Sequence, residues 1–70
     1  MRDEELLALS KVRPIDAAKY LQNRTRVHDI RVLAQQGKCK FCTAIRGNGR
    51  FKYRIHVGLL IRYKHSELGL

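Results

Sequence analysis

The sequence lacks several features that would place the chain in a membrane, outside the cell or among the enzymes. No apolar run approaches the roughly 18 residues that a membrane-spanning helix needs, and residues 1–5 do not open a secretory leader. The sequence also has no Ser-His-Asp set, no paired-carboxylate site and no glycine-rich phosphate loop. We therefore expect a soluble cytoplasmic protein that is not an enzyme and uses no cofactor.

Cysteine occurs only at Cys39 and Cys42, a spacing that is also found in metal and redox sites. Zinc usually takes four ligands, and the histidines that would complete the set, His28, His56 and His65, do not have the close paired spacing of a zinc module. The segment also leads into a predicted strand, whereas a redox motif opens a helix. We predict two small, partly buried, reduced thiols under a hairpin and no metal site.

Acidic residues are scarce over most of the chain. Residues 1–22 carry four basic and four acidic side chains, whereas residues 23–70 carry eleven Lys or Arg against Asp29 and Glu67 and hold the whole net charge of +9. A neutral beginning and a basic remainder indicate a surface that faces a polyanion, and charge alone does not separate DNA from RNA. The alternative is a basic face that only keeps the protein in solution.

A chain of 70 residues allows one domain with a small core, and an apolar content of 44% argues against disorder. Residues 3–10 predict a short helix, with acidic side chains at the positive end of its dipole. Leu6 and Leu9 would cover the core, although this segment could equally be a mobile arm or a dimer contact. We therefore divide the chain into an N-terminal helix or arm, residues 1–11, and a domain over residues 12–70.

A second helix is predicted over Pro14–Gln22, because proline is well tolerated at the first helical position. Its apolar face holds Ala17, Ala18 and Leu21, with Tyr20 beside it. The two small alanines let another helix approach closely. A polar turn and another amphipathic helix follow, and this order predicts a helix-turn-helix, although any pair of helices in a small bundle has a similar pattern.

The next helix is predicted over Arg24–Gly37, with Thr25 as its N-cap and Gly37 as the left-handed residue after its end. An apolar stripe runs along it through Val27, Ile30 and Ala34, with Leu33 beside the stripe. Arginine can pair with guanine or a phosphate, and glutamine can read adenine. The candidate DNA-contacting residues of this helix are Arg24, Arg26, His28, Asp29, Arg31 and Gln35.

After this helix the pattern alternates and predicts strands over Lys40–Arg46 and Phe51–Val57, joined by a Gly-Asn-Gly turn. In the second strand, the apolar residues, from Phe51 to Val57, face the helices, and Lys52, Arg54 and His56 face the other way. A rigid hairpin with a cationic rim can follow a phosphate backbone or enter a minor groove, although it could also be an ordinary solvated hairpin. The candidate wing residues are Lys38, Lys40, Arg46, Asn48, Arg50 and Lys52.

Gly58–Leu68 is predicted as a closing helix whose core contacts are Leu59, Leu60 and Tyr63. Lys64 and His65 suit the negative end of its dipole. Two further apolar residues, Ile61 and Leu68, fit the same face poorly and are candidates for a partner contact.

Over residues 12–66 the sequence resembles the small excisionase-type proteins of phages and conjugative elements of Gram-positive bacteria. The resemblance is carried by the sequences Pro-Ile-Asp-Ala-Ala-Lys-Tyr-Leu (14–21) and Ile-Arg-Val-Leu-Ala-Gln-Gln-Gly-Lys-Cys-Lys-Phe (30–41), and by a glycine-rich hairpin followed by Tyr-Arg-Ile (53–55). It implies an α+β fold, a MerR-like winged helix-turn-helix with a β-hairpin wing and a C-terminal helix. The segment 21–37 is longer than in that family, so either the turn is looser or the recognition helix begins earlier.

The resemblance also implies a function. Such proteins bind double-stranded DNA in several copies beside an attachment site, bend it and direct an integrase, a tyrosine recombinase, toward excision. By position, Arg26, His28, Asp29 and Arg31 would lie on the reading face, and Arg46, Asn48, Arg50 and Lys52 would form the wing. Two alternatives stay open: a transcriptional regulator of a phage or mobile element on the same fold, and a protein-binding module with an anti-defence or accessory role.

Overall fold

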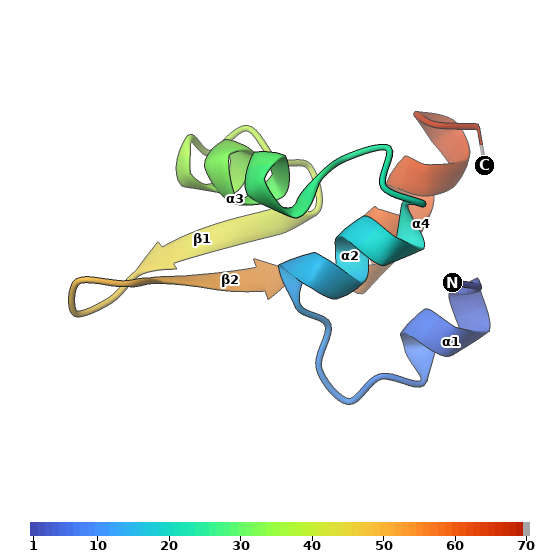
Figure 1. Cartoon of the computed structure of the whole chain (residues 1–70), viewed down its shortest axis with the longest axis horizontal. Coiled ribbons are helices and arrows are strands. Elements are labelled where there is room, and N and C mark those ends of the chain that lie inside the picture. The colour runs from blue at the N-terminus through green and yellow to red at the C-terminus, as the bar shows by residue number, and fades with distance from the viewer. Residues whose placement is uncertain (70) are drawn as a thin grey trace.

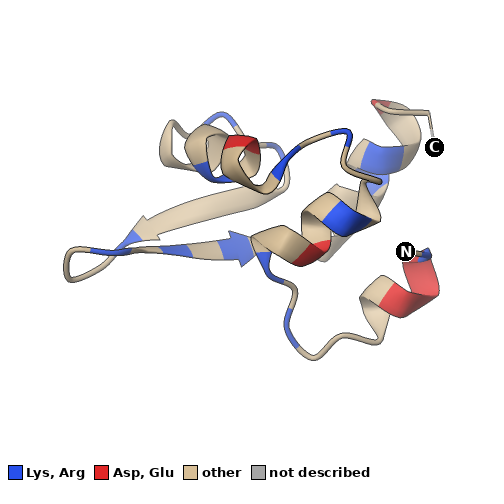
Figure 2. Ribbon diagram, in the orientation of Figure 1, with Lys and Arg blue, Asp and Glu red and all other residues tan. Residues whose placement is uncertain are grey.

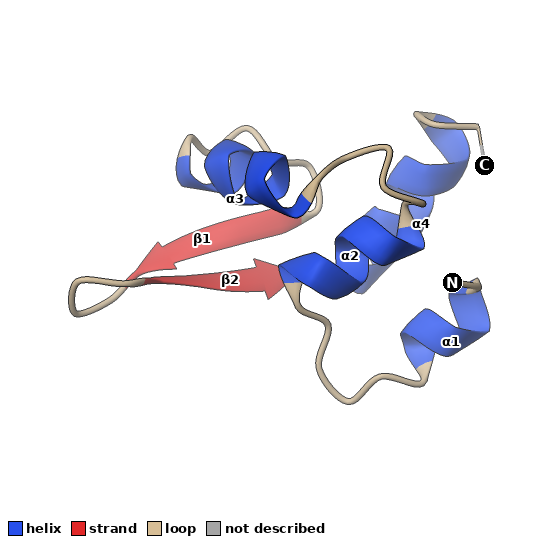
Figure 3. Cartoon of the chain, viewed as in Figure 1, coloured by secondary structure: helices blue, strands red, loops and turns tan. Residues whose placement is uncertain are grey.

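The computed structural model of the chain describes residues 1–69. Within this range the elements are α1 (Asp3–Leu7), α2 (Pro14–Tyr20), α3 (Val27–Gln35), β1 (Cys42–Arg46), β2 (Phe51–Ile55) and α4 (Val57–Ser66). Helices α1, α2 and α4 lie toward one end, the antiparallel β1–β2 hairpin extends from them along the longest dimension, and α3 packs over β1 (Figures 1 and 3). This small α+β domain is compatible with a helix-turn-helix followed by a wing.

The start of α2 is stabilised by a side chain from inside the helix. Arg13, the N-cap, has no acceptor to offer the first turn, but the carboxylate of Asp16 accepts a hydrogen bond from the Arg13 backbone N–H at 3.0 Å. This hydrogen bond lowers the pKa of Asp16. Ala17 and Leu21 are buried as predicted. Tyr20 is fully buried, whereas the sequence pattern placed it beside the apolar face.

The turn between α2 and α3 contains two left-handed residues, Gln22 with φ 57° and Asn23 with φ 59°. The Asn23 backbone N–H donates to the carbonyl oxygen of Ala18 at 2.9 Å, which satisfies one of the last carbonyls of α2. These residues lengthen the turn, so α3 begins at Val27 and its N-cap is Arg26. The prediction that Thr25 caps the helix was therefore wrong, and the looser turn is the arrangement present.

The end of α3 was predicted correctly. Gly37 has φ +70°, its N–H donates to Ala34 O at 3.1 Å, and the Lys38 N–H donates to Leu33 O at 2.8 Å. This pair of bonds is a Schellman motif, which glycine accommodates without a steric penalty. Ile30 and Ala34 are buried as expected, but Leu33 is 37% exposed because it lies on the flank of the helix that no element covers fully.

The hairpin is shorter than the alternation predicted. β1 begins at Cys42, and β2 ends at Ile55 because Val57 already belongs to α4. The pairs run from Cys42↔Ile55 to Arg46↔Phe51, and the four-residue loop between the strands is closed by a hydrogen bond from the Gly47 N–H to Arg50 O at 2.7 Å. At the outer end of β2, beyond the reach of the helices, Phe51 is 39% exposed, whereas it was predicted to face the core.

Helix α4 returns the chain to the helical end. Leu60 is fully buried and the Tyr63 ring packs on Phe41 with 5.1 Å between centroids, as predicted for core contacts. The expectation for Leu59 was wrong, since it is 45% exposed. Ile61 and Leu68 pack partly buried against the core, so the prediction that they fit this face poorly was wrong.

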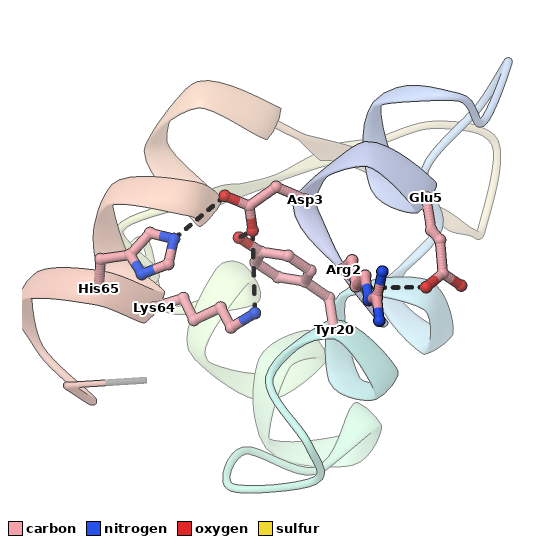
Figure 4. A network of polar contacts seen from close by, with 6 residues as sticks. All are labelled: Arg2, Asp3, Glu5, Tyr20, Lys64 and His65. Atoms are coloured by element: carbon pink, nitrogen blue, oxygen red, sulfur yellow. Dashed lines mark hydrogen bonds and ion pairs between the residues drawn. The ribbon is translucent and has the colours of Figure 1, made fainter.

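The N-terminal segment is a helix docked on α2 and α4 (Figure 4). Leu6 is fully buried, while Leu9 lies beyond the end of α1 and is 38% exposed, contrary to the prediction that it covers the core. The Asp3 carboxylate accepts hydrogen bonds from the Tyr20 hydroxyl at 2.5 Å and the His65 ring at 3.1 Å. Both lower the pKa of Asp3, and the Lys64 ammonium lies 3.8 Å away.

The two thiols lie where β1 leaves the helical layer. Cys42 is buried and Cys39 is partly buried, as the sequence predicted, and burial raises the pKa of Cys42 to about 11. A raised pKa keeps this thiol protonated and poorly nucleophilic at neutral pH. From residue 1 to residue 69, no helix has the length and apolar character needed to cross a bilayer.

Candidate nucleic-acid interface

Two polar residues of α3 face the hairpin and are joined to it through Tyr53. The Gln35 side-chain amide donates a hydrogen bond to the Tyr53 hydroxyl at 2.6 Å, and the Arg31 guanidinium lies 6.0 Å from the centre of the Tyr53 ring. Arg31 and Gln35 are one helical turn apart, so they share a flank of α3. The structure therefore places these two predicted DNA contacts against Tyr53 of the hairpin.

A groove runs between this flank of α3, the start of α2 and β2. Four cationic side chains from three parts of the chain converge there: Lys11, Arg13, Arg31 and Lys52. Its remaining lining residues are Pro14, Ile15, Val27 and Tyr53. Among residues 1–69, no acidic side chain lines the groove, so its lining combines apolar and cationic side chains.

One acid lies close to the groove, but it is directed inward. Arg13 Nε is 3.3 Å from Asp16 Oδ2, and the Asp16 side chain is only 12% exposed while that of Arg13 is 66% exposed. The carboxylate is thus held at the start of α2 by the Arg13 backbone and side chain. Most of the Arg13 side chain remains accessible to a ligand in the groove.

A second hollow continues the same surface toward the turn between α2 and α3. Ile15 and Val27 line both hollows, and the second adds Lys19 and Arg26 together with Ala18 and Asn23. Six cations therefore line these two adjoining hollows. In Figure 2 basic residues lie on the hairpin, on α3 and in the segment before α2, and others lie on α2 and α4, while the acidic residues of α1 lie at the end of the molecule away from the hairpin.

The end of the hairpin carries the outer part of the predicted wing. Arg46, Asn48 and Arg50 are all exposed there, next to the exposed Phe51. Lys52 pairs across the hairpin with Ile45, whose side chain is 52% exposed. The hairpin therefore presents cations and two accessible apolar side chains together.

Two predicted wing residues lie apart from the hairpin. Lys38 and Lys40 precede β1 and line a depression on the opposite flank of α3, with Leu33 and the end of α4. The Lys40 ammonium is 2.6 Å from a carboxylate oxygen of Glu67, which raises the pKa of Lys40. Its charge is thereby partly balanced by a carboxylate at the C-cap of α4.

The remaining predicted DNA contacts are exposed near the start of α3. Arg24 lies in the turn, and His28 and Asp29 lie in the first turn of α3. Asp29 suits the positive end of the helix dipole. Arg26, the N-cap, lines the second hollow, and His28 lies one turn before Arg31 on the same flank of α3.

Sequence reasoning missed the contribution of the segment before α2 and of Tyr53. Lys11 and Arg13 had been counted only in a charge balance that summed to zero, and Tyr53 only as an apolar strand residue. One signal was available: two basic residues directly before a proline that begins a helix are tethered near the start of that helix. Their approach to Lys52, far along the chain, depends on the tertiary fold.

Within residues 1–69, no group of three or more His, Cys, Asp or Glu side chains is arranged to hold a metal ion. No family model, no curated protein and no solved structure matches the chain.

Proposed function

We propose that this protein binds double-stranded DNA through a winged helix-turn-helix. The observation that carries the proposal is the continuous cationic surface between α2, α3 and the hairpin, which no acidic side chain lines. Phosphates supply most of the affinity in such complexes, because each contact releases a condensed counterion. Helix α3 would enter the major groove while the hairpin follows the adjacent backbone or minor groove.

Within this proposal, the residues divide into sequence reading and positioning. Arg31 is the best placed to pair with guanine or with a phosphate, and its flank also carries Gln35, a residue type that reads adenine. Gln35 would exchange its hydrogen bond with Tyr53 for one to a base. Arg46, Asn48 and Arg50 would contact the backbone or minor groove at the hairpin end.

An excisionase-like role is the finer part of the proposal and rests on the sequence resemblance. In this role several copies bind beside an attachment site, bend the DNA and direct an integrase. The exposed Phe51 and Ile45 beside the hairpin cations fit a bending protein, since apolar side chains inserted between base steps kink the duplex. Footprinting separates this role, with repeated sites and a bend, from a dimeric regulator on a symmetric operator with half-sites about one helical turn apart.

The binding proposal is tested by titrating a labelled duplex from the neighbourhood of the gene at low salt and then at rising salt. We expect retardation of the duplex and an affinity that falls by about 0.9 log unit per phosphate contact for each tenfold rise in salt. A duplex that remains unshifted at low salt contradicts the proposal.

The double variant Arg26→Ala, Arg31→Ala separates DNA binding from a role as a protein-binding module. We expect DNA binding and biological activity to be lost together. If activity persists after DNA binding is lost, the protein acts through another protein. Arg62→Ala is the matched control, because this exposed arginine lies on α4 in a different depression.

A further inference from the structure

The segment between α1 and α2 rises to the start of α2 near the end of β2 (Figure 1), and its Lys11 and Arg13 line the groove with Arg31 and Lys52. The net charge of residues 1–22 is zero, so the sequence alone does not mark this segment as basic. In space its two cations belong to the basic end of the molecule and not to the acidic α1.

Both ends of this segment are held. At its end, the Arg13 backbone N–H donates to the Asp16 carboxylate at 3.0 Å, and Val12 packs partly buried against the core. At its beginning, α1 is anchored by the fully buried Leu6 and by Asp3, which accepts a hydrogen bond from the Tyr20 hydroxyl at 2.5 Å. Lys11 and Arg13 therefore lose less conformational entropy on binding than they would in a free tail.

We propose that the α1–α2 segment is a third DNA-binding element, in which Lys11 and Arg13 bind phosphodiester groups of the strand that runs through the groove between α3 and the hairpin. This inference rests on the proposed DNA binding. Phosphate contacts of this kind fix the register and tilt of the protein on the duplex without reading its sequence. The apolar floor, with Ile15 and Val27, would face the deoxyribose edge of the same strand.

The chemistry of the two cations suits different parts of this task. The Arg13 guanidinium has a fork of donors, and only its Nε is engaged by Asp16, so its terminal nitrogens can bind a phosphate bidentately. Lys11 is exposed and supplies a point charge beside it. The acid in contact with Arg13 is mostly buried and so orients the guanidinium without occupying the groove.

The test compares salt dependence of binding to a labelled random-sequence duplex for the wild type, Lys11→Ala, the double variant Lys11→Ala, Arg13→Ala, and Arg62→Ala as a remote charge control. Log affinity falls with log salt, and we expect this negative slope to become shallower by about 0.9 for the single variant and by about twice that for the double variant. Lys11→Arg should restore the slope of the single variant. The control Arg62→Ala should leave the slope unchanged.

The outcomes separate the inference from the proposed function. If the wild type binds and both groove variants keep its slope, the inference is overturned and DNA binding stands. If the wild type does not bind the duplex at all, the proposed function fails first. Lys11→Ala removes no hydrogen bond or ion pair of Asp16, so this single variant keeps the test valid should the double variant not fold.

Discussion

The two ends of the molecule use their charges differently. At the α1–α4 end, Lys64 is only 7% exposed, lies 3.8 Å from Asp3 and stands 4.2 Å from the centre of the Tyr20 ring. At the hairpin end, Arg31 and Lys52 line an open groove that has no acid among its lining residues. Paired charges stabilise the first end, and the excess of one sign at the second end favours the proposed binding of a polyanion.

Net charge alone does not show which basic side chains are available for binding. Lys40 and Lys64 contribute to the +9 in the same way as the groove residues do, yet each has an acidic neighbour. Charges of that kind serve the fold, whereas those of the groove have few compensating partners. Separate changes at the two ends should therefore change separate properties.

The largest effect is expected from removing two groove cations together. The double variant Arg31→Ala, Lys52→Ala should lower duplex affinity by about a hundredfold at moderate salt, because two phosphate or base contacts are lost. Its melting temperature should stay close to that of the wild type, since both side chains are exposed. Fluorescence anisotropy measures affinity and thermal unfolding measures stability. A loss of stability as large as the loss of binding free energy would contradict the separate roles of the two ends.

Removing the buried lysine should have the reverse effect. Lys64→Ala is expected to lower the free energy of unfolding by about 1–3 kcal/mol, because the side chain is buried and its ammonium lies over the Tyr20 ring and near Asp3. Duplex affinity of the folded fraction should not change. Lys64→Met is the matched control, since it retains most of the buried stem without the charge, and denaturant unfolding distinguishes packing from charge.

Asp3 gives the α1–α4 end a dependence on pH. Its pKa is lowered in the fold by the hydrogen bonds from Tyr20 and His65, so the carboxylate stabilises the protein fully above its ordinary pKa of 3.8 and loses that effect as pH falls through the lower folded value. Asp3→Asn should therefore be less stable than the wild type at neutral pH. The difference should shrink below about pH 4. Urea unfolding at a series of pH values measures it, and a constant difference would contradict this role.

The smallest effect is expected at the exposed ion pair. The Lys40 and Glu67 side chains are 64% and 48% exposed, and such pairs contribute about 0–1 kcal/mol. Lys40→Ala should change both stability and duplex affinity only slightly, although the sequence pattern included this residue in the wing. A loss of affinity comparable with that of Lys52→Ala would return Lys40 to the DNA-facing surface.

Local chemistry made most of the elements predictable. The proline that begins α2, Gly37 after α3, the Gly-Asn-Gly turn and the alternation in β2 each reflect a backbone preference over a few residues. The start of α3 was harder to predict. It is delayed by the left-handed conformations of Gln22 and Asn23, which residues other than glycine adopt uncommonly.

The candidate interface was predictable only in part. Helical spacing brought Arg31 and Gln35 onto one flank, but their partner Tyr53 lies on another element. The pairing of Lys40 with Glu67 and the approach of Lys11 to Lys52 join residues distant in sequence, so no periodicity reveals them. Charge patterns thus locate a basic region, and tertiary packing decides which of its members are available.

The most direct test of the division between the two ends is an NMR titration of the labelled protein with a short duplex. We expect the changes in backbone amide chemical shift on binding to be concentrated in α3, β2 and the residues of the groove. The amides of Arg62 and Lys64 on α4 should be nearly unchanged. Shifts concentrated on α1 and α4, with the hairpin and α3 unaffected, would contradict it.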